Sequence, residues 1–146
     1  MATTTAICNS YKQEILQGIH LAADTYKMAL IKVAPAGTYN KSTTNYSDVT
    51  GNSDEVVGAG YTVGGATLSG YAVSLGADTL TAILTFTSPT WPAASISATA
   101  AIIYNSSRSD KALAVFDFGG TITSTNDTFT ATIPAATYTT GLIRIS

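Results

Sequence analysis

The fold is decided by residues 96–119, ISATAAIIYNSSRSDKALAVFDFG, in which two apolar runs flank a polar and charged centre. The runs 96–104 and 111–119 are rich in Ala, Ile, Val and Phe and have the length of strands. The six residues NSSRSD separate them, and so short a polar connection joins neighbouring antiparallel strands. The stretch therefore predicts a β-hairpin with a charged tip.

The sequence gives no support for a catalytic site, in this stretch or elsewhere. The triplet Asp117-Phe118-Gly119 binds magnesium in protein kinases, but the Gly-rich loop, strand lysine and His-Arg-Asp loop that give it this meaning are missing from the sequence. The sole histidine, His20, has Asp24 four positions on, and we expect a structural role for it because no substrate pocket is indicated. We expect no enzyme activity, no metal and no cofactor.

Composition favours a sheet-rich domain that acts through protein contacts. Of the 146 residues, 45% are hydrophobic and only 11% are charged, less than half the usual share. A formal net charge of −2 without a basic stripe predicts no nucleic-acid partner. The sequence has no apolar run long enough for a membrane helix and no secretory leader at MATTTAICNS, so we expect a protein made in the cytoplasm without a signal peptide.

The beginning of the chain predicts an arm followed by one helix. Residues 1–6 are polar and aperiodic, so we expect a flexible arm that a partner orders. Apolar residues then recur every four positions: they are Ile7, Tyr11, Ile15 and Ile19. This period predicts an amphipathic helix over about residues 9–20, and Ser10 with Gln13 has the spacing of a capping box. The free Cys8 is interpreted as a small packed side chain.

Strands dominate the rest of the chain. Residues 26–33 form a short apolar run typical of a buried strand, and a long polar loop follows over about residues 34–58. Further strands are predicted at residues 66–75, 79–87, 129–134 and 141–146, with turns or corners at 76–78, 88–92 and 124–127. This spacing is typical of one antiparallel β-sandwich, jelly-roll or immunoglobulin-like, over residues 7–146.

Three elements exceed what a sandwich needs, and we expect them to contact a partner. The candidate interface residues are Ala2, Thr3, Thr4 and Thr5 in the arm, Tyr39, Tyr46, Asp54 and Glu55 in the long loop, and Arg108, Asp110 and Lys111 at the hairpin tip. For the tip, a merely solvated turn is the alternative. Trp91 joins the candidates with two interpretations, a core side chain closing the sandwich or a platform for sugar rings.

Four stretches carry a resemblance to a known group of proteins: ICNSYKQEILQGIH at 7–20, DTYKMALI at 24–31, IYNSSRSDKALAVFDFGG at 103–120 and FTATIP at 129–134. In these the chain resembles small virion proteins of tailed phages, among them capsid cement or decoration proteins of short-tailed phages and cyanophages. They cover about a third of the chain, whereas the long loop carries no such likeness.

The resemblance implies a β-sandwich on the capsid exterior that binds the outer surface of the major capsid protein shell and stabilises the head. Dimers or trimers at local symmetry axes of the shell are expected with it. It implies no active-site residue. A tail-associated module and a receptor- or carbohydrate-binding virion module remain the alternatives.

Overall fold

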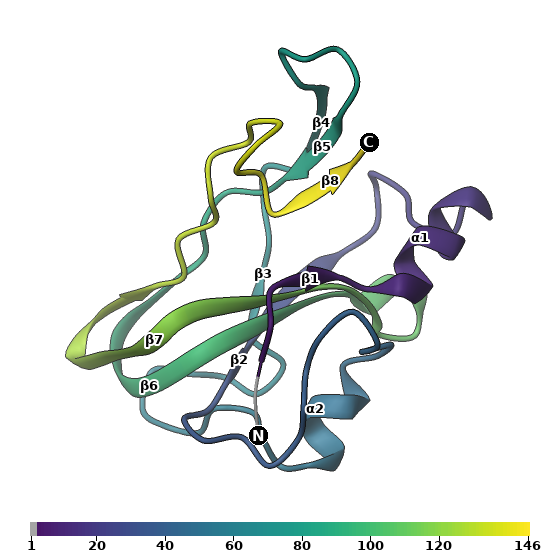
Figure 1. Ribbon diagram of the computed structural model, residues 1–146. Coiled ribbons are helices and arrows are strands. Elements are labelled where there is room, and N and C mark those ends of the chain that lie inside the picture. Colours follow the sequence, from purple (N-terminus) through teal and green to yellow (C-terminus); the bar gives the residue numbers. More distant parts are fainter. Residues whose placement is uncertain (1–2) are drawn as a thin grey trace.

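The computed structural model of the protein describes residues 3–146. Strands account for 43% of the chain and helices for 11%, so the fold is mainly β. The strands pair antiparallel in two sheets, with one helix beside them near the N-terminus (Figure 1). The predicted class, an antiparallel β-sandwich with a short N-terminal helix, is confirmed.

The larger sheet has five strands in the order β1-β7-β6-β2-β3 and the smaller sheet has three in the order β4-β5-β8. In the larger sheet these are β1 (Ala6–Ile7), β7 (Lys111–Thr130), β6 (Thr90–Asn105), β2 (Tyr26–Ile31) and β3 (Ala66–Thr67). In the smaller sheet they are β4 (Ala72–Leu75), β5 (Ala82–Thr85) and β8 (Ile143–Ile145). Figure 1 shows the smaller sheet standing above the long β6–β7 ribbon.

The predicted hairpin is present and is longer than expected. Strands β6 and β7 pair with Ile102 opposite Val115, and the single 3-10 turn η1 (Ser106–Arg108) connects them. The turn predicted at 124–127 and the corner predicted at 88–92 are wrong, because both segments belong largely to these strands. Asn126 takes a positive φ of 49° beside a register shift, so this turn-forming residue makes a bulge and the strand continues.

The core lies on both faces of the larger sheet, because β2 is covered on each side. On one face Tyr46 from the long loop stacks on Tyr104 of β6, with ring centroids 4.4 Å apart. Towards the smaller sheet, Tyr26 packs against Tyr71 and Phe86 at 5.4 Å. Apart from Lys27, β2 is apolar and buried, and this sequence reflects burial on both faces, as in strands with no solvent side.

Helix α1 (Asn9–Leu16) ends four residues before the predicted boundary, since the chain turns at Gly18 with a φ of +68°. The predicted capping box is wrong: Cys8 is the N-cap residue and the buried Ser10 hydroxyl has no partner. Cys8 is buried as expected, and burial raises the pKa of its thiol to about 12.

The arm predicted over residues 1–6 is attached to the domain from Thr3 onward. Thr3 forms a bridge to Tyr39, and the Thr4 N–H donates to the Tyr39 carbonyl at 2.9 Å. Ala6 then begins β1, which pairs with β7. Met1 and Ala2, including the predicted contact residue Ala2, lie outside the described residues. The long loop also contains a short helix, α2 (Ser47–Gly51), that the sequence did not indicate.

Candidate functional site

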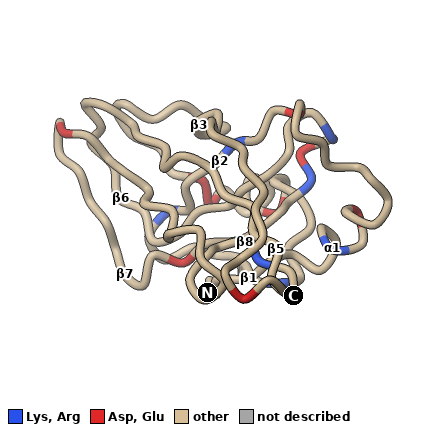
Figure 2. The backbone as a smooth tube through the Cα atoms, turned by 90° about the horizontal axis from the view of Figure 1, so that it is seen from above, with Lys and Arg blue, Asp and Glu red and all other residues tan. Residues whose placement is uncertain are grey.

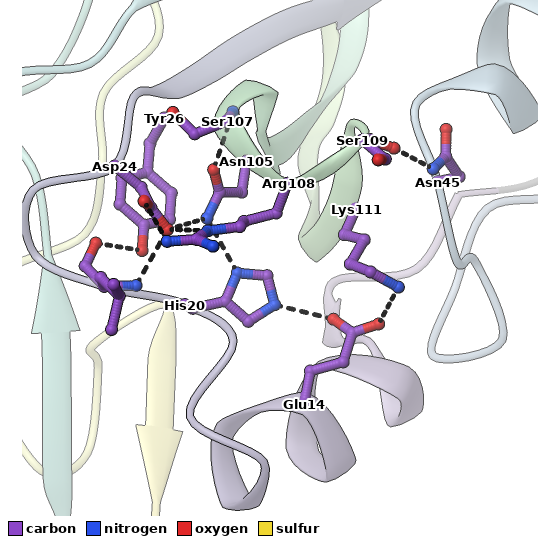
Figure 3. Close-up of polar contacts among 11 residues, drawn as sticks. Glu14, His20, Asp24, Tyr26, Asn45, Asn105, Ser107, Arg108, Ser109 and Lys111 are labelled. Carbon is purple, nitrogen blue, oxygen red and sulfur yellow. Dashed lines mark hydrogen bonds and ion pairs between the residues drawn. The ribbon is translucent and has the colours of Figure 1, made fainter.

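Six polar residues from five parts of the chain meet beside α1 and the hairpin tip (Figure 3). We call them the polar network: Glu14, His20, Asp24, Asn105, Arg108 and Lys111. The chain between α1 and β2 supplies the histidine and the aspartate, while the ends of β6 and β7 and the turn η1 supply the last three residues. Residues almost a hundred positions apart are therefore connected.

One half of the polar network is a two-point ion pair. The Arg108 Nε and Nη2 atoms donate to the two Asp24 oxygens at 2.9 and 3.0 Å, the fork geometry that suits guanidinium and carboxylate. The Asn105 amide and the Leu21 N–H also donate to Asp24. Chiefly because of Arg108, the pKa of the Asp24 carboxyl lies well below its ordinary value.

The other half joins Glu14, His20 and Lys111. Glu14 accepts from His20 Nε2 at 2.7 Å and from Lys111 Nζ at 3.1 Å. The Asn105 amide is oriented by the Ser107 N–H, which donates to its oxygen, so its nitrogen donates to His20 Nδ1 at 3.1 Å. These contacts place the ring proton on Nε2 and give both ring nitrogens a partner.

The polar network binds structural elements to one another. An acid–base catalyst needs a ring nitrogen that faces a substrate, whereas both nitrogens of His20 are engaged and its side chain is 3% exposed. Its ring also packs edge-on against Tyr11 at 4.9 Å. Within residues 3–146 no cluster of three or more His, Cys, Asp or Glu side chains could hold a metal ion. The geometry fits the structural role expected for His20.

A second polar cluster organises the long loop around the adjacent residues Asp54 and Glu55. The Asp54 carboxylate accepts from the Ala36 and Gly37 N–H groups and from the Tyr39 hydroxyl at 2.6–2.8 Å. Burial opposes ionisation of Asp54, but these bonds and Lys32 at 3.2 Å outweigh it and lower its pKa to about 2.

Glu55 likewise accepts hydrogen bonds from backbone and tyrosine donors, here from the next part of the loop. Its carboxylate accepts from the Tyr61 hydroxyl and the Gly64 N–H, both at 2.7 Å, and from the Tyr46 hydroxyl. Burial followed by the Glu55 contact raises the pKa of Tyr61 well above its ordinary value. The loop is therefore folded on two internal carboxylates.

These contacts bear on the predicted interface. Tyr39, Asp54, Glu55 and Trp91 are buried within the chain, which does not support their predicted role as partner contacts. Polar loop residues turn inward here because a long connection must satisfy its own backbone groups. Trp91 packs against Phe129 and Tyr61, which confirms its core interpretation and leaves no free ring face for a sugar.

Each of the remaining predicted contact residues is either half-buried or exposed. Tyr46 is half-buried by its stacking on Tyr104, and Arg108 and Lys111 are engaged in ion pairs. Asp110, also half-buried, accepts from the Tyr46 N–H through its carbonyl. In the arm, Thr4 and Thr5 are exposed and Thr3 is half-buried. The structure thus brings the hairpin tip to residues 44–46 of the loop and to α1, and the arm to Tyr39 of the same loop.

Sequence reasoning missed an exposed apolar surface formed by α1 and the smaller sheet. Leu16 is 90% exposed, Val73 63% and Leu75 61%. Two cross-strand rows make the apolar sheet face: they are Val73–Leu84–Ile143 and Leu75–Ala82–Ile145. The alternation in residues 72–75 and 82–85 could have indicated this face, but not its exposure.

Between α1 and this sheet face lie two hollows of about 180 and 430 Å³. They adjoin, since Ile15 and Ile145 line both, and we call them together the α1–β8 groove. His20 borders the smaller hollow, but its other lining residues are aromatic or aliphatic. The larger hollow is lined by Ile15, Leu16 and Ile145 together with Lys12, Arg144 and Ser146. The apolar part of the groove, beside β4 and β5, suits an apolar partner surface.

No protein-family model matches the sequence, and no curated protein or solved structure matches it either. Among the described residues, no helix combines the length and the apolar character needed to cross a membrane. Function is therefore inferred from the residues and their geometry.

The Asp24–Arg108 pair predicts a loss of stability in acid. The folded-state pKa of Asp24 lies below its ordinary value of 3.8, so the unfolded chain binds the proton more tightly. The stabilisation is present above about pH 4 and is lost as the pH falls further. We expect Arg108→Gln to unfold at lower urea than the wild type at about pH 6 and to lose less stability between about pH 6 and 3.

Urea unfolding followed by tryptophan fluorescence measures both quantities. Lys27→Gln removes the same charge from a lysine outside the ion pairs and should leave the pH dependence unchanged. Equal pH dependence in the wild type and Arg108→Gln would show that the pair contributes nothing to stability.

Proposed function

We propose that this protein is a non-enzymatic structural protein of a virus particle, which binds the outer surface of the major capsid protein shell and stabilises the head. The supporting observation is the exposed apolar surface around the α1–β8 groove, with Leu16, Val73 and Leu75 more than half exposed. Contiguous apolar surface of this kind marks sites of protein–protein contact.

The sequence connects this surface to the capsid. Residues 7–20, which contribute to the resemblance to decoration proteins, contain α1 (Asn9–Leu16), which builds one wall of the groove. The charged residues of the polar network and the carboxylates of Asp54 and Glu55 are engaged internally. The surface around the groove offers a large protein partner mainly apolar side chains, with Lys12 and Arg144 at its edge.

The physical properties suit a cement protein. Apolar contacts are insensitive to ionic strength, whereas exposed ion pairs are screened by salt, and the chain carries few charges. Many identical sites on a shell add up, so a modest interface per copy holds the protein firmly. Dimers or trimers at the local symmetry axes of the shell belong to the same proposal.

Co-sedimentation with the cognate empty capsids tests the proposal. We expect the wild type to bind and Leu16→Glu to lower the affinity at least about tenfold, because burial of a leucine contributes about 1.5–3 kcal/mol. Val57→Glu is the matched control, since Val57 is 87% exposed but lies away from the groove, beside Ser95 and Ile96. Its affinity should stay within about twofold of the wild type.

Two results would contradict this function. The first is no binding of the wild type to capsids, and the second is equal weakening by both substitutions. Labelling the protein in intact particles distinguishes a decoration protein from a tail-associated module. Copies spread over the shell support decoration, and copies confined to one vertex support the tail-associated module.

A further inference from the structure

A second concave site lies between the start of α1, the long loop and the C-terminal strand. Its volume is about 480 Å³, within the range of small-molecule sites. Three basic side chains line it, Lys12 of α1, Lys41 of the long loop and Arg144 of β8, and we call it the cationic cavity. No Asp or Glu side chain among the described residues lines it.

The concentration of charge is unusual for this chain, which has seven Lys and Arg residues in total. Within the described residues three of them, Lys32, Arg108 and Lys111, form ion pairs with carboxylates. Of the other four, all but Lys27 line the cationic cavity. Figure 2 shows how sparse the charges are along the chain, with Lys or Arg positions on α1 and near the C-terminal strand.

The guanidinium of Arg144 is held in place before any ligand arrives. Its Nη1 atom donates to the Tyr138 and Thr139 carbonyls at 2.9 and 2.6 Å. The turn that carries these carbonyls is closed by the Gly141 N–H, which donates to the Thr137 carbonyl. Nε and Nη2 are thereby left to donate elsewhere, and a fixed guanidinium edge suits a carboxylate or phosphate.

The opposite wall is also fixed by the backbone. The Asn9 N–H donates to the Lys41 carbonyl at 2.8 Å, which holds Lys41 beside the start of α1, and Lys12 follows one helical turn later. Thr81 lines the cavity too, and its hydroxyl and N–H donate to Asp78. The Asp78 carboxylate is thus occupied by its own turn.

We propose that the cationic cavity binds a multiply charged anion, a phosphate- or polycarboxylate-bearing group. Three like charges around one cavity repel one another, and an anion between them removes that repulsion while accepting their hydrogen bonds. This site goes beyond the proposed capsid contact. Lys12, Arg144 and Ser146 also line the larger hollow of the α1–β8 groove, so the site is tested on the isolated protein, where no capsid contact is needed.

Isothermal titration calorimetry of the isolated protein tests the site with inorganic pyrophosphate, tricarballylate and acetate at one ionic strength. We expect one of the two polyanions to bind with one-to-one stoichiometry and acetate to give no measurable heat. The polyanion that binds distinguishes a phosphate source from a carboxylate source. Because Ser146 also lines the cavity, the purification tag belongs at the N-terminus.

Substitutions locate the binding. Arg144→Gln should weaken the polyanion at least about tenfold, the size expected for losing a charged hydrogen-bond donor, and Lys12→Gln should weaken it severalfold. Lys12→Gln is the second variant because Arg144 also supports its own turn. Lys27→Gln removes the same charge elsewhere and should change the affinity less than about twofold. Binding of neither polyanion, or equal weakening by Lys27→Gln, would overturn the site.

Discussion

Gly65→Ala is expected to destabilise the protein by roughly 4 kcal/mol, because the new methyl group has no space and the backbone is in a left-handed conformation. A Cβ at Gly65 would lie 1.9 Å from the Met28 carbonyl oxygen and 2.7 Å from the Ala29 Cα, which are backbone atoms of β2. Its φ of +75° adds the strain that any L-residue suffers there. Thermal or urea unfolding measures the loss.

Gly18→Ala separates the two contributions. Gly18 has a similar φ of +68°, but a Cβ there would meet no atom within 4 Å. We expect this substitution to cost only the conformational strain, about 1 kcal/mol. Equal losses for Gly18→Ala and Gly65→Ala would show that the close approach of residue 65 to β2 does not matter for stability.

Asp54→Asn is expected to cost about 3 kcal/mol. The carboxylate accepts from two backbone N–H groups and from the Tyr39 hydroxyl in a fully buried position, with Lys32 beside it. An amide has one acceptor oxygen, and its NH₂ group would face a donor, so at least one buried donor loses its partner. Urea unfolding at neutral pH measures the loss.

Asp127→Asn is the matched control. Asp127 is exposed and one of its oxygens accepts from the Thr128 N–H, a role that the amide oxygen of Asn can keep. Its stability should stay within about 0.5 kcal/mol of the wild type. If Asp54→Asn were equally mild, the long loop would not depend on its internal carboxylates.

The hairpin shows where sequence patterns succeed and where they end. Residues 96–104 and 111–119 were predicted as two strands that flank a tip, and these two segments lie within β6 and β7. The ends were misjudged, because residues 88–92 and 124–127 carry turn-forming Pro, Asn and Asp, which also suit bulges. At a bulge the chain continues to pair with its partner strand, whereas at a turn it reverses direction. The local sequence does not show whether a partner strand continues alongside.

The burial of three of the predicted contact residues was missed for a related reason. Tyr39, Asp54 and Glu55 belong to a polar stretch, and polar stretches are usually exposed. In this loop the two carboxylates turn inward to accept backbone and tyrosine donors. The exposed apolar surface around Leu16 was missed because apolar periodicity does not show which apolar residues of a helix or sheet remain uncovered in the folded chain.

By itself, the sequence determined the mainly β class, the central hairpin, the buried strand β2 and the packed Cys8. These follow from residue type and apolar periodicity, which act over a few neighbouring positions. Only the tertiary structure decided which polar groups are internal, how residues from α1 to β7 form one polar network, and where apolar and cationic surfaces remain open. Those outcomes depend on contacts between segments distant in sequence, where a partner is chosen by folding and not by spacing along the chain.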